Sequence, residues 1–397
     1  LSIFDIVNSV IGTSSVTLIA RYYGSGDKEK TVEVIEQTII FKFFLALIIG
    51  VIAGIFVPYA LKPLANNNEI LQMAIIYGRI RLLTLPLAYS SYTVNTALRC
   101  IGDAKKPLYL MLFTALLNAI LDPIMIFDII PFINIRGMGL GIAGAAYATV
   151  ISQFLSFLLG LYILMSGKTF IKIRFKRGIY FVKDIDMKLI TIGLPSGIET
   201  FFRNIATFVI MKFLTIYGVA VVAAYGICSR IVQLVIMPIF GLEMGTSVIV
   251  GQCLGCDKAD RAEKAVYLAA KVSFLIMIAA GLILNIMPGL IMKFFTEEQK
   301  VIAIGVTYLR YFSIAALFAG PAGALTAALF GAGENLPSMI AGISTIWLVQ
   351  IPLMYLFVAV YRLPINWVWL TYIIQYILQS MIILYYLKKG DWKHKSI

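Results

Sequence analysis

Asp122 offers the clearest chemistry in this sequence, because it stands in the apolar segment LLNAILDPIM one helical turn after Asn118. Side chains four residues apart lie on one face of a helix, so the two polar groups are neighbours. Together they can hold Na⁺ through oxygen ligands, or the carboxylate can carry a proton. The structural alternative is that Asp122 caps the turn that Pro123 interrupts, since proline removes a backbone hydrogen bond.

A second acidic centre lies in the carboxyl-terminal half of the sequence. Glu199 follows the segment GLPSG, and Arg203 stands one helical turn later. The pair predicts either a protonatable carboxylate that binds a cationic substrate or a buried structural ion pair. Glu243, in the segment IFGLEMGTS, is a further carboxylate candidate near the interior of this half.

Uncharged polar and aromatic side chains form a third group of candidates for contact with a substrate. Several recur at helical spacing on one face of the last apolar segment, as the lining of a cleft would. Aromatic faces attract organic cations by roughly 0.5 to 2 kcal/mol each, although membrane proteins also place tyrosines in the interfacial belt. These candidates are Gln153, Gln350, Tyr372, Gln375, Tyr376 and Gln379.

The composition requires membrane-spanning helices to position these side chains. Hydrophobic residues make up 60% of the chain, the mean hydropathy is +0.92, and charged residues make up 13%, against roughly 25% in soluble domains. Apolar runs of roughly 20 residues recur without the alternation of barrel strands, so we expect an all-α polytopic membrane protein. Eleven spans are predicted near residues 2–23, 39–61, 80–98, 107–127, 138–166, 189–215, 219–253, 265–292, 301–331, 336–361 and 364–387.

The sequence repeats itself at a distance of about 230 residues. Residues Gly12–Glu33 are echoed by Gly245–Ala265, and Thr96–Phe127 by Thr326–Phe357. Paired membrane halves of this kind usually enclose a pathway that opens alternately to either side. The segment 193–230 has no upstream partner, so we expect the complete protein to have twelve spans in two pseudo-symmetric six-helix bundles, with the first span missing from this sequence.

Lysine and arginine collect in alternate connectors and in the tail, which the positive-inside rule places in the cytoplasm. The net charge of +13 is therefore mainly a signal of topology, not of nucleic-acid binding. The connector 166–188 separates the halves, either as an amphipathic helix on the membrane surface or as a flexible linker. The expected parts are an amino-terminal lobe (1–166), a cytoplasmic linker (167–188), a carboxyl-terminal lobe (189–387) and a cytoplasmic tail (388–397).

Several motifs occur in the order found in one transporter family: ARYYGSGDKEK, ALRCIGDAKKP, GLGIAGAAYATVISQ, GLPSGIET and GQCLGCDKADRAEK. Over essentially its whole length the chain resembles the multidrug and toxic compound extrusion (MATE) transporters, of bacterial type. The resemblance implies two bundles around a central cleft, and export of organic cations or drugs by alternating access, driven by Na⁺ or H⁺. In the DNA-damage-inducible branch of that family, an Asn, an Asp and a Thr form the cation site of the first lobe. The matching positions are Asn118, Asp122 and Thr149, while the family's other key acid lies on the first helix.

Two other functions remain as alternatives. A flippase for lipid-linked oligosaccharides shares the two-lobed plan but predicts a cleft lined by several cations, and Arg203 and Arg230 are the only arginines near mid-membrane. An enzyme needs a nucleophile with a base or a metal site, yet His394 is the only histidine and no HExxH or GxSxG motif occurs. We expect a monomer of the plasma membrane with a cationic or amphipathic small-molecule substrate, no nucleic acid, and no cofactor beyond the coupling ion.

Overall fold

The computed structural model describes residues 2–62, 67–131, 134–167, 169–175 and 178–395. Over these ranges the chain is almost entirely helical, and its one β contact is an isolated bridge between Ile129 and Arg136. The helices divide into two compact units. The larger unit comprises Leu1–Gly26 and Ile190–Ile397, and the smaller unit comprises Asp27–Leu189.

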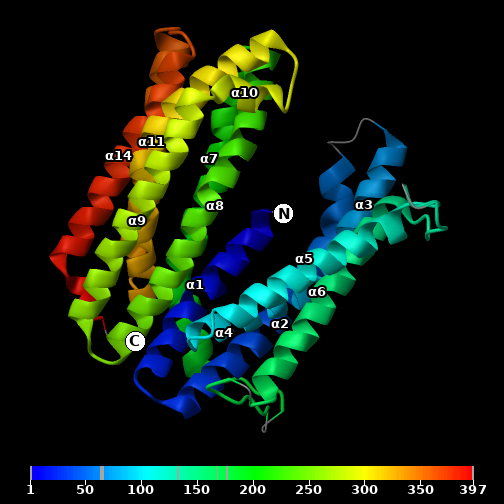
Figure 1. Ribbon diagram of the computed structural model, residues 1–397, viewed down its shortest axis with the longest axis vertical. Coiled ribbons are helices and arrows are strands. Elements are labelled where there is room, and N and C mark those ends of the chain that lie inside the picture. Colours follow the sequence, from blue (N-terminus) through cyan, green and yellow to red (C-terminus); the bar gives the residue numbers. More distant parts are fainter. Residues whose placement is uncertain (1, 63–66, 132–133, 168, 176–177, 396–397) are drawn as a thin grey trace. The chain divides into compact units, whose positions relative to one another are not determined.

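The described part of the smaller unit contains five long helices and the first residues of α7, which continues into the larger unit. Asp27 caps the first of them, since its carboxylate accepts a hydrogen bond of 3.0 Å from the backbone N–H of Lys30. Within this unit α5 and α6 lie side by side (Figure 1). The helices are α2 (Lys28–Leu61), α3 (Asn68–Leu83), α4 (Leu85–Cys100), α5 (Lys105–Ile126) and α6 (Gly141–Met165), followed by α7 (Lys183–Thr215).

The larger unit is built around the packing of α11 against α8, α9 and α14 (Figure 1). Gly333 and Gly390 end α11 and α14 in the left-handed conformation, with φ values of +78° and +86°. Besides α1 (Ser2–Gly24) and the rest of α7, its main elements are α8 (Val219–Gly255), α9 (Ala259–Ile286), α10 (Pro288–Lys293), α11 (Gln299–Ala332), α12 (Asn335–Ser344), α13 (Ile351–Tyr355) and α14 (Asn366–Lys389).

The all-α polytopic class predicted from the sequence is confirmed. Every predicted span contains a long helical segment, and α3 and α4 form one segment bent by 47° at Thr84. Among the described residues, eight helices are long and apolar enough to cross a membrane, or nine if the bent pair counts as one span. The more polar helices α1 and α7 are outside that set.

Packing assigns α1 to a different half from the one that the sequence repeat suggests. Within the larger unit α1 lies against α8 and α11. Its contact with α7 is so close that a Cβ atom on Gly193 would stand 1.7 Å from the carbonyl oxygen of Val10, the approach that small residues permit between membrane helices. The predicted lobe limits stay a prediction about the duplication, whereas the borders between the compact units lie at Gly26–Asp27 and at Leu189–Ile190.

The connector before α7 is fastened to α2 by the buried side chain of Glu36. Its Oε1 atom accepts hydrogen bonds from the backbone N–H groups of Arg174 (3.1 Å) and Phe175 (2.8 Å). Ile171 and Ile173 are 3% and 0% exposed. The described part of the connector before Lys183 has no helix, so the surface-helix prediction is wrong there. The N–H groups of Arg174 and Phe175 bond to the Glu36 side chain, and that of Ile173 bonds to the carbonyl of Leu164.

Gln37 fixes a second part of the same connector. Its side-chain amide donates to the carbonyl of Tyr180 (2.9 Å), and its Oε1 atom accepts from the N–H of Val182 (3.1 Å). Gln37 is fully buried. Residues 171–175 and 178–182, called the strap below, are thus held at one point each by adjacent residues of one helix.

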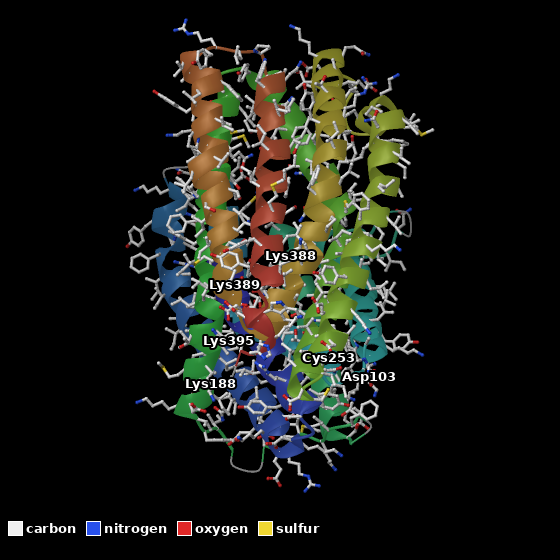
Figure 2. The ribbon with its side chains drawn as sticks, turned by 90° about the vertical axis from the view of Figure 1, so that its left-hand side faces the viewer. Asp103, Lys188, Cys253, Lys388, Lys389 and Lys395 are labelled. Carbon is white, nitrogen blue, oxygen red and sulfur yellow. The ribbon has the colours of Figure 1, made fainter. Side chains whose placement is uncertain are left out.

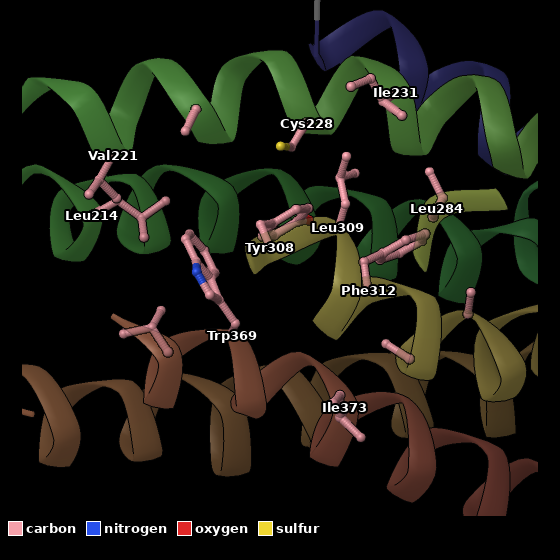
Figure 3. Close-up of a cluster of buried hydrophobic side chains, with 14 of the residues drawn as sticks. Leu214, Val221, Cys228, Ile231, Leu284, Tyr308, Leu309, Phe312, Trp369 and Ile373 are labelled. Atoms are coloured by element: carbon pink, nitrogen blue, oxygen red, sulfur yellow. The ribbon is translucent and has the colours of Figure 1, made fainter. Parts of the chain in front are cut away.

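Aromatic side chains fill the core of the larger unit. Figure 3 shows Trp369 of α14 beside Tyr308 of α11, with Phe312 further along α11. The ring centres of Tyr308 and Trp369 are 4.8 Å apart with the planes nearly perpendicular, the edge-to-face arrangement that aromatic pairs prefer. This core fixes α11 and α14 relative to α8, where Val221, Cys228 and Ile231 complete it.

The predicted tail folds back onto the larger unit. Lys388 and Lys389 form the last turn of α14 (Figure 2), and Trp392 beyond it is 2% exposed. Lys393 pairs with Glu263 of α9 at 2.7 Å, and Lys395 pairs with Glu334 at 2.9 Å. The described tail is therefore part of the packed structure.

Candidate functional site

A cavity of about 370 Å³ lies within the larger unit, and two of the predicted acidic residues, Glu199 and Glu243, line it. Glu199 and Arg203 reach it from α7, and Glu243 reaches it from α8. The remaining wall is mixed polar and apolar, and includes Ser9, Ser196, Thr200, Phe240, Thr326, Phe330, Tyr376 and Gln379.

Glu199 is held from three sides. Arg203 forms an ion pair with its Oε1 atom, as the i, i+4 spacing predicts, and the hydroxyl of Ser338 on α12 donates to Oε2 at 3.0 Å. A Cβ on Gly342 would stand 2.5 Å from Oε1, so this glycine gives the carboxylate its place against α12. Glu199 is 7% exposed, whereas the Arg203 side chain is 51% exposed. Glu199 and Arg203 therefore form the predicted ion pair, and both residues also line the cavity.

Glu243 is the carboxylate that stands free in this cavity. Within the described part of the chain it forms no ion pair or hydrogen bond with another side chain. Its carboxyl group rests against α11, where a Cβ on Gly323 would lie 1.8 Å from Oε1. Arg230, on the same helix, does not line the cavity. Arg203 acts on Glu243 electrostatically but pairs with Glu199. A half-buried carboxylate that no hydrogen bond or ion pair holds is suited to receive a cation or a proton.

The polar residues of α14 divide into two sets. Tyr376 and Gln379 line the cavity. Gln375 instead donates to Gln379 at 2.8 Å, and the Tyr372 hydroxyl donates to that of Tyr225 at 3.3 Å inside the aromatic core. Tyr372 and Gln375 therefore contact other side chains and do not line the cavity. Their role as substrate contacts stays a prediction.

Gln350 lies in a stretch of helix with unusual backbone geometry. It ends the π-helical segment η2 (Thr345–Gln350), and a second one, η3 (Leu356–Val360), follows Pro352. Gln350 is 2% exposed, and its amide nitrogen has no hydrogen-bond partner among the described residues. Short π-helical stretches often mark functional sites, and Pro352 was the only sign of this one in the sequence.

The cation candidates of the smaller unit lie on α5 and α6. The amide of Asn118 donates to Oδ1 of Asp122 at 3.2 Å, so the predicted one-turn pairing is present. Thr149 on α6 donates to the carbonyl of Ala145 at 2.9 Å. Gln153 follows one turn later and is half-buried. Among the described residues, no three His, Cys, Asp or Glu side chains gather as a metal site would require.

A larger cavity, of about 640 Å³, lies in the smaller unit between the strap and the start of α2. Its charged lining is balanced, with four carboxylates and four cations. Two of those carboxylates already have structural tasks, Asp27 as a helix cap and Glu36 as the anchor of the strap. Size alone therefore does not identify the site. We take the cavity of the larger unit as the candidate site, because Glu199, Arg203 and Glu243 line it.

Comparison with known proteins agrees with this architecture. The family model MatE matches residues 1–124 and 195–356. The chain is 26% identical over 389 residues to the probable multidrug resistance protein YoeA of Bacillus subtilis (strain 168), covering 98% of this chain and 83% of that protein. It is also 26% identical over 391 residues to the multidrug export protein MepA of Staphylococcus aureus (strain MRSA252), covering 96% and 82%.

Solved structures show the same fold. One described as the outward-facing conformation of a multidrug resistance MATE family transporter of the MOP superfamily superimposes with a TM-score of 0.89 at 24% identity, covering 99% of this chain and 86% of that one. The flippase alternative fits less well, because the cavity of the larger unit is lined by a single guanidinium among two carboxylates. The chain is therefore a member of the MATE family of multidrug efflux transporters, a polytopic membrane transporter of small molecules and not an enzyme.

Proposed function

We propose that this chain exports organic cations across the bacterial plasma membrane by antiport, driven by the inward movement of Na⁺ or H⁺. The observation that carries the proposal is the pair of carboxylates, Glu199 and Glu243, in one cavity with a single guanidinium. With both acids ionised the three groups sum to a net charge of −1, which favours a cationic ligand.

The cavity also suits an amphipathic ligand. Its volume of about 370 Å³ lies within the roughly 300 to 1,000 Å³ typical of small-molecule sites. Phe240, Phe330 and Tyr376 supply aromatic surface, and an organic cation over an aromatic face gains roughly 0.5 to 2 kcal/mol. Charge at Glu243 and aromatic contact therefore act together on the same kind of substrate.

Coupling follows if Glu243 cannot hold the ion and the substrate at once. A proton or Na⁺ on this carboxylate removes the charge that attracts the organic cation, so the two ligands compete and each favours a different conformation. Asn118, Asp122 and Thr149 are the candidates for a second ion site in the smaller unit. No resident cofactor is required, and the tail, which is rich in lysine, faces the cytoplasm in this proposal.

The test is ethidium export from proteoliposomes in which a Na⁺ gradient or a pH gradient is imposed separately. We expect one of the two gradients to drive export, and Glu243→Gln to abolish the driven part while the protein still purifies as a stable monomer. Asp122→Asn tests the second ion site in the same assay. Export that persists after both gradients are dissipated would refute the antiport mechanism.

A further inference from the structure

A cavity of about 230 Å³ in the larger unit takes no part in the function proposed above. It lies where the ends of α1 and α8 meet, and Arg21 and Asp257 line it from the two sides. Both helix ends stand at the edge of a predicted span, on the side that the charge pattern assigns to the cytoplasm. We therefore expect the cavity at the boundary between membrane and water. The rest of its wall is formed by Leu18, Tyr22, Ser25, Leu254 and Gly255.

The two charged side chains of this cavity attract one another without pairing. Asp257 acts on Arg21 electrostatically, yet within the described ranges neither side chain forms an ion pair. The Nη1 atom of Arg21 is buried, and no residue that the structure describes accepts a hydrogen bond from it. A partly buried guanidinium without a partner has lost hydration and gained no hydrogen bond in return. An anionic group in the cavity would supply that partner.

The helices themselves cannot close the gap between the two charges. A Cβ atom on Gly24 would stand 2.2 Å from the carbonyl oxygen of Gln252, and one on Gly255 would stand 2.1 Å from that of Arg21. The backbones of α1 and α8 are therefore already in contact, as small residues permit. Because the helices cannot approach further, a bound group has to span the distance between Arg21 and Asp257.

The sequence repeat shows that Asp257 has left a structural task. Its counterpart, about 230 residues earlier in the repeated segment, is Asp27, which caps α2 by accepting a hydrogen bond from Lys30. Asp257 instead has a φ of +56°, and α9 begins at Ala259 without a side-chain cap. The exposed carboxylate of Asp257 is thus open to a ligand on the side of the cavity opposite Arg21.

We propose that this cavity binds the phosphoethanolamine group of a membrane lipid, with the phosphate against Arg21 and the ammonium group against Asp257. A guanidinium matches the oxygens of a phosphate in geometry, and an ammonium group forms a charge-assisted hydrogen bond with a carboxylate. The volume of about 230 Å³ is below the roughly 300 Å³ at which sites for drug-sized molecules begin, so it suits a headgroup. The proposal does not depend on Glu243 or on the coupling ion.

An anionic lipid is the competing occupant. Asp257 also lines a neighbouring cavity, and the cations of that cavity are Lys258, Arg261 and Lys264. Those cations attract any anionic headgroup at the membrane surface, at about 1 kcal/mol each. The opposed charges of Arg21 and Asp257 favour a zwitterion instead, so the two occupants can be told apart by the headgroup.

The experiment offers the purified full chain an equal mixture of dioleoyl phosphatidylethanolamine and dioleoyl phosphatidylcholine, and native mass spectrometry counts the lipids retained. The choline headgroup carries the same charges, but its ammonium group has no N–H to donate. We expect the ethanolamine lipid to be retained about tenfold more, as a hydrogen bond between charged groups predicts. Asp257→Asn should abolish this preference, and Arg21→Gln should weaken the retention of both lipids about tenfold.

Asp260→Asn is the matched control, since Asp260 lines the neighbouring cavity and not this one, and the preference should persist in it. If Arg21→Gln does not fold, Asp257→Asn decides the matter, because asparagine also tolerates a positive φ. Soluble glycerophosphoethanolamine at the same concentration should not displace the lipid, and displacement would overturn the lipid as the source of the group. Equal retention of the two lipids by the unaltered protein, or stronger retention of dioleoyl phosphatidylglycerol when it is added, would overturn the proposal.

Discussion

Gly323 should control the affinity for organic cations, although it has no side chain to contact them. A Cβ at this position would stand 1.8 Å from Oε1 of Glu243 and 2.9 Å from its Cδ, whereas ordinary contact begins at 3.4 Å. In Gly323→Ala the carboxylate oxygen must therefore withdraw by the difference, about 1.6 Å. Glu243 ends in a flexible side chain, so the carboxylate can move while α11 keeps its place.

The expected size of the effect follows from Coulomb's law. At an effective dielectric constant of about 20, two unit charges attract by about 4.2 kcal/mol at about 4 Å and by about 3.0 kcal/mol at about 5.6 Å. The loss of about 1.2 kcal/mol corresponds to an affinity about eightfold weaker. Alanine also favours a helix interior over glycine by about 1 kcal/mol, so thermal stability should not fall.

Equilibrium binding of ethidium to the protein in nanodiscs measures this change. Gly241→Ala is the matched control, because it adds the same methyl group to α8 two residues before Glu243, where nothing lies within 4 Å. Combining Gly323→Ala with Glu243→Asp should restore part of the affinity, since the shorter acid relieves the contact. Unchanged ethidium binding in Gly323→Ala, or an equal loss in Gly241→Ala, would refute the placement of Glu243 in the binding cavity.

Two further predictions concern the smaller unit. Glu36→Ala removes the acceptor of two strap N–H groups at a cost of roughly 1.5 to 3 kcal/mol, so trypsin should cut after Arg174 much faster than in the control Glu29→Ala. An unchanged rate of cleavage would show that the strap does not depend on Glu36. Burial raises the pKa of Asp186, which precedes the predicted span 189–215, from 3.8 to about 6. The folded state therefore binds this proton more tightly than the unfolded state, and the melting temperature should fall as the pH rises from about 4 through 6. Asp186→Asn should remove that part of the pH dependence, and an identical pH profile in the variant would contradict the assignment.

Much of the fold could be predicted because a bilayer restricts the possible structures. A spanning segment must satisfy its own backbone hydrogen bonds and must be apolar over roughly 20 residues. Hydropathy and charge therefore located the eight or nine described helices that could cross a membrane, and the described residues of the remaining predicted spans, near α1 and α7, are helical too. The pairing of Glu199 with Arg203 and of Asn118 with Asp122 also followed from the sequence, because both depend only on the spacing within one helix.

Contacts between elements distant in the chain could not be predicted in this way. Lys42 was not singled out, since only the tertiary structure brings the Tyr89 and Tyr92 rings over its ammonium group. The connector 166–188 was expected to be a surface helix or a flexible linker. Its described residues before Lys183 form no helix, and backbone groups of the strap find partners in Glu36 and Gln37.

The sequence by itself determined that this chain is a helical membrane protein with an internal repeat, because hydropathy, charge asymmetry and repetition are properties of the chain alone. Its function as a transporter came from the resemblance of its motifs to the MATE family. Only the tertiary structure decided which carboxylate is free and which is paired. Glu199 meets Ser338 and Gly342, whereas Glu243 meets the bare backbone of Gly323. The physical reason is that the environment of a charge depends on residues 80 or more positions away in the chain, whose approach is fixed by the packing of α7 against α12 and of α8 against α11.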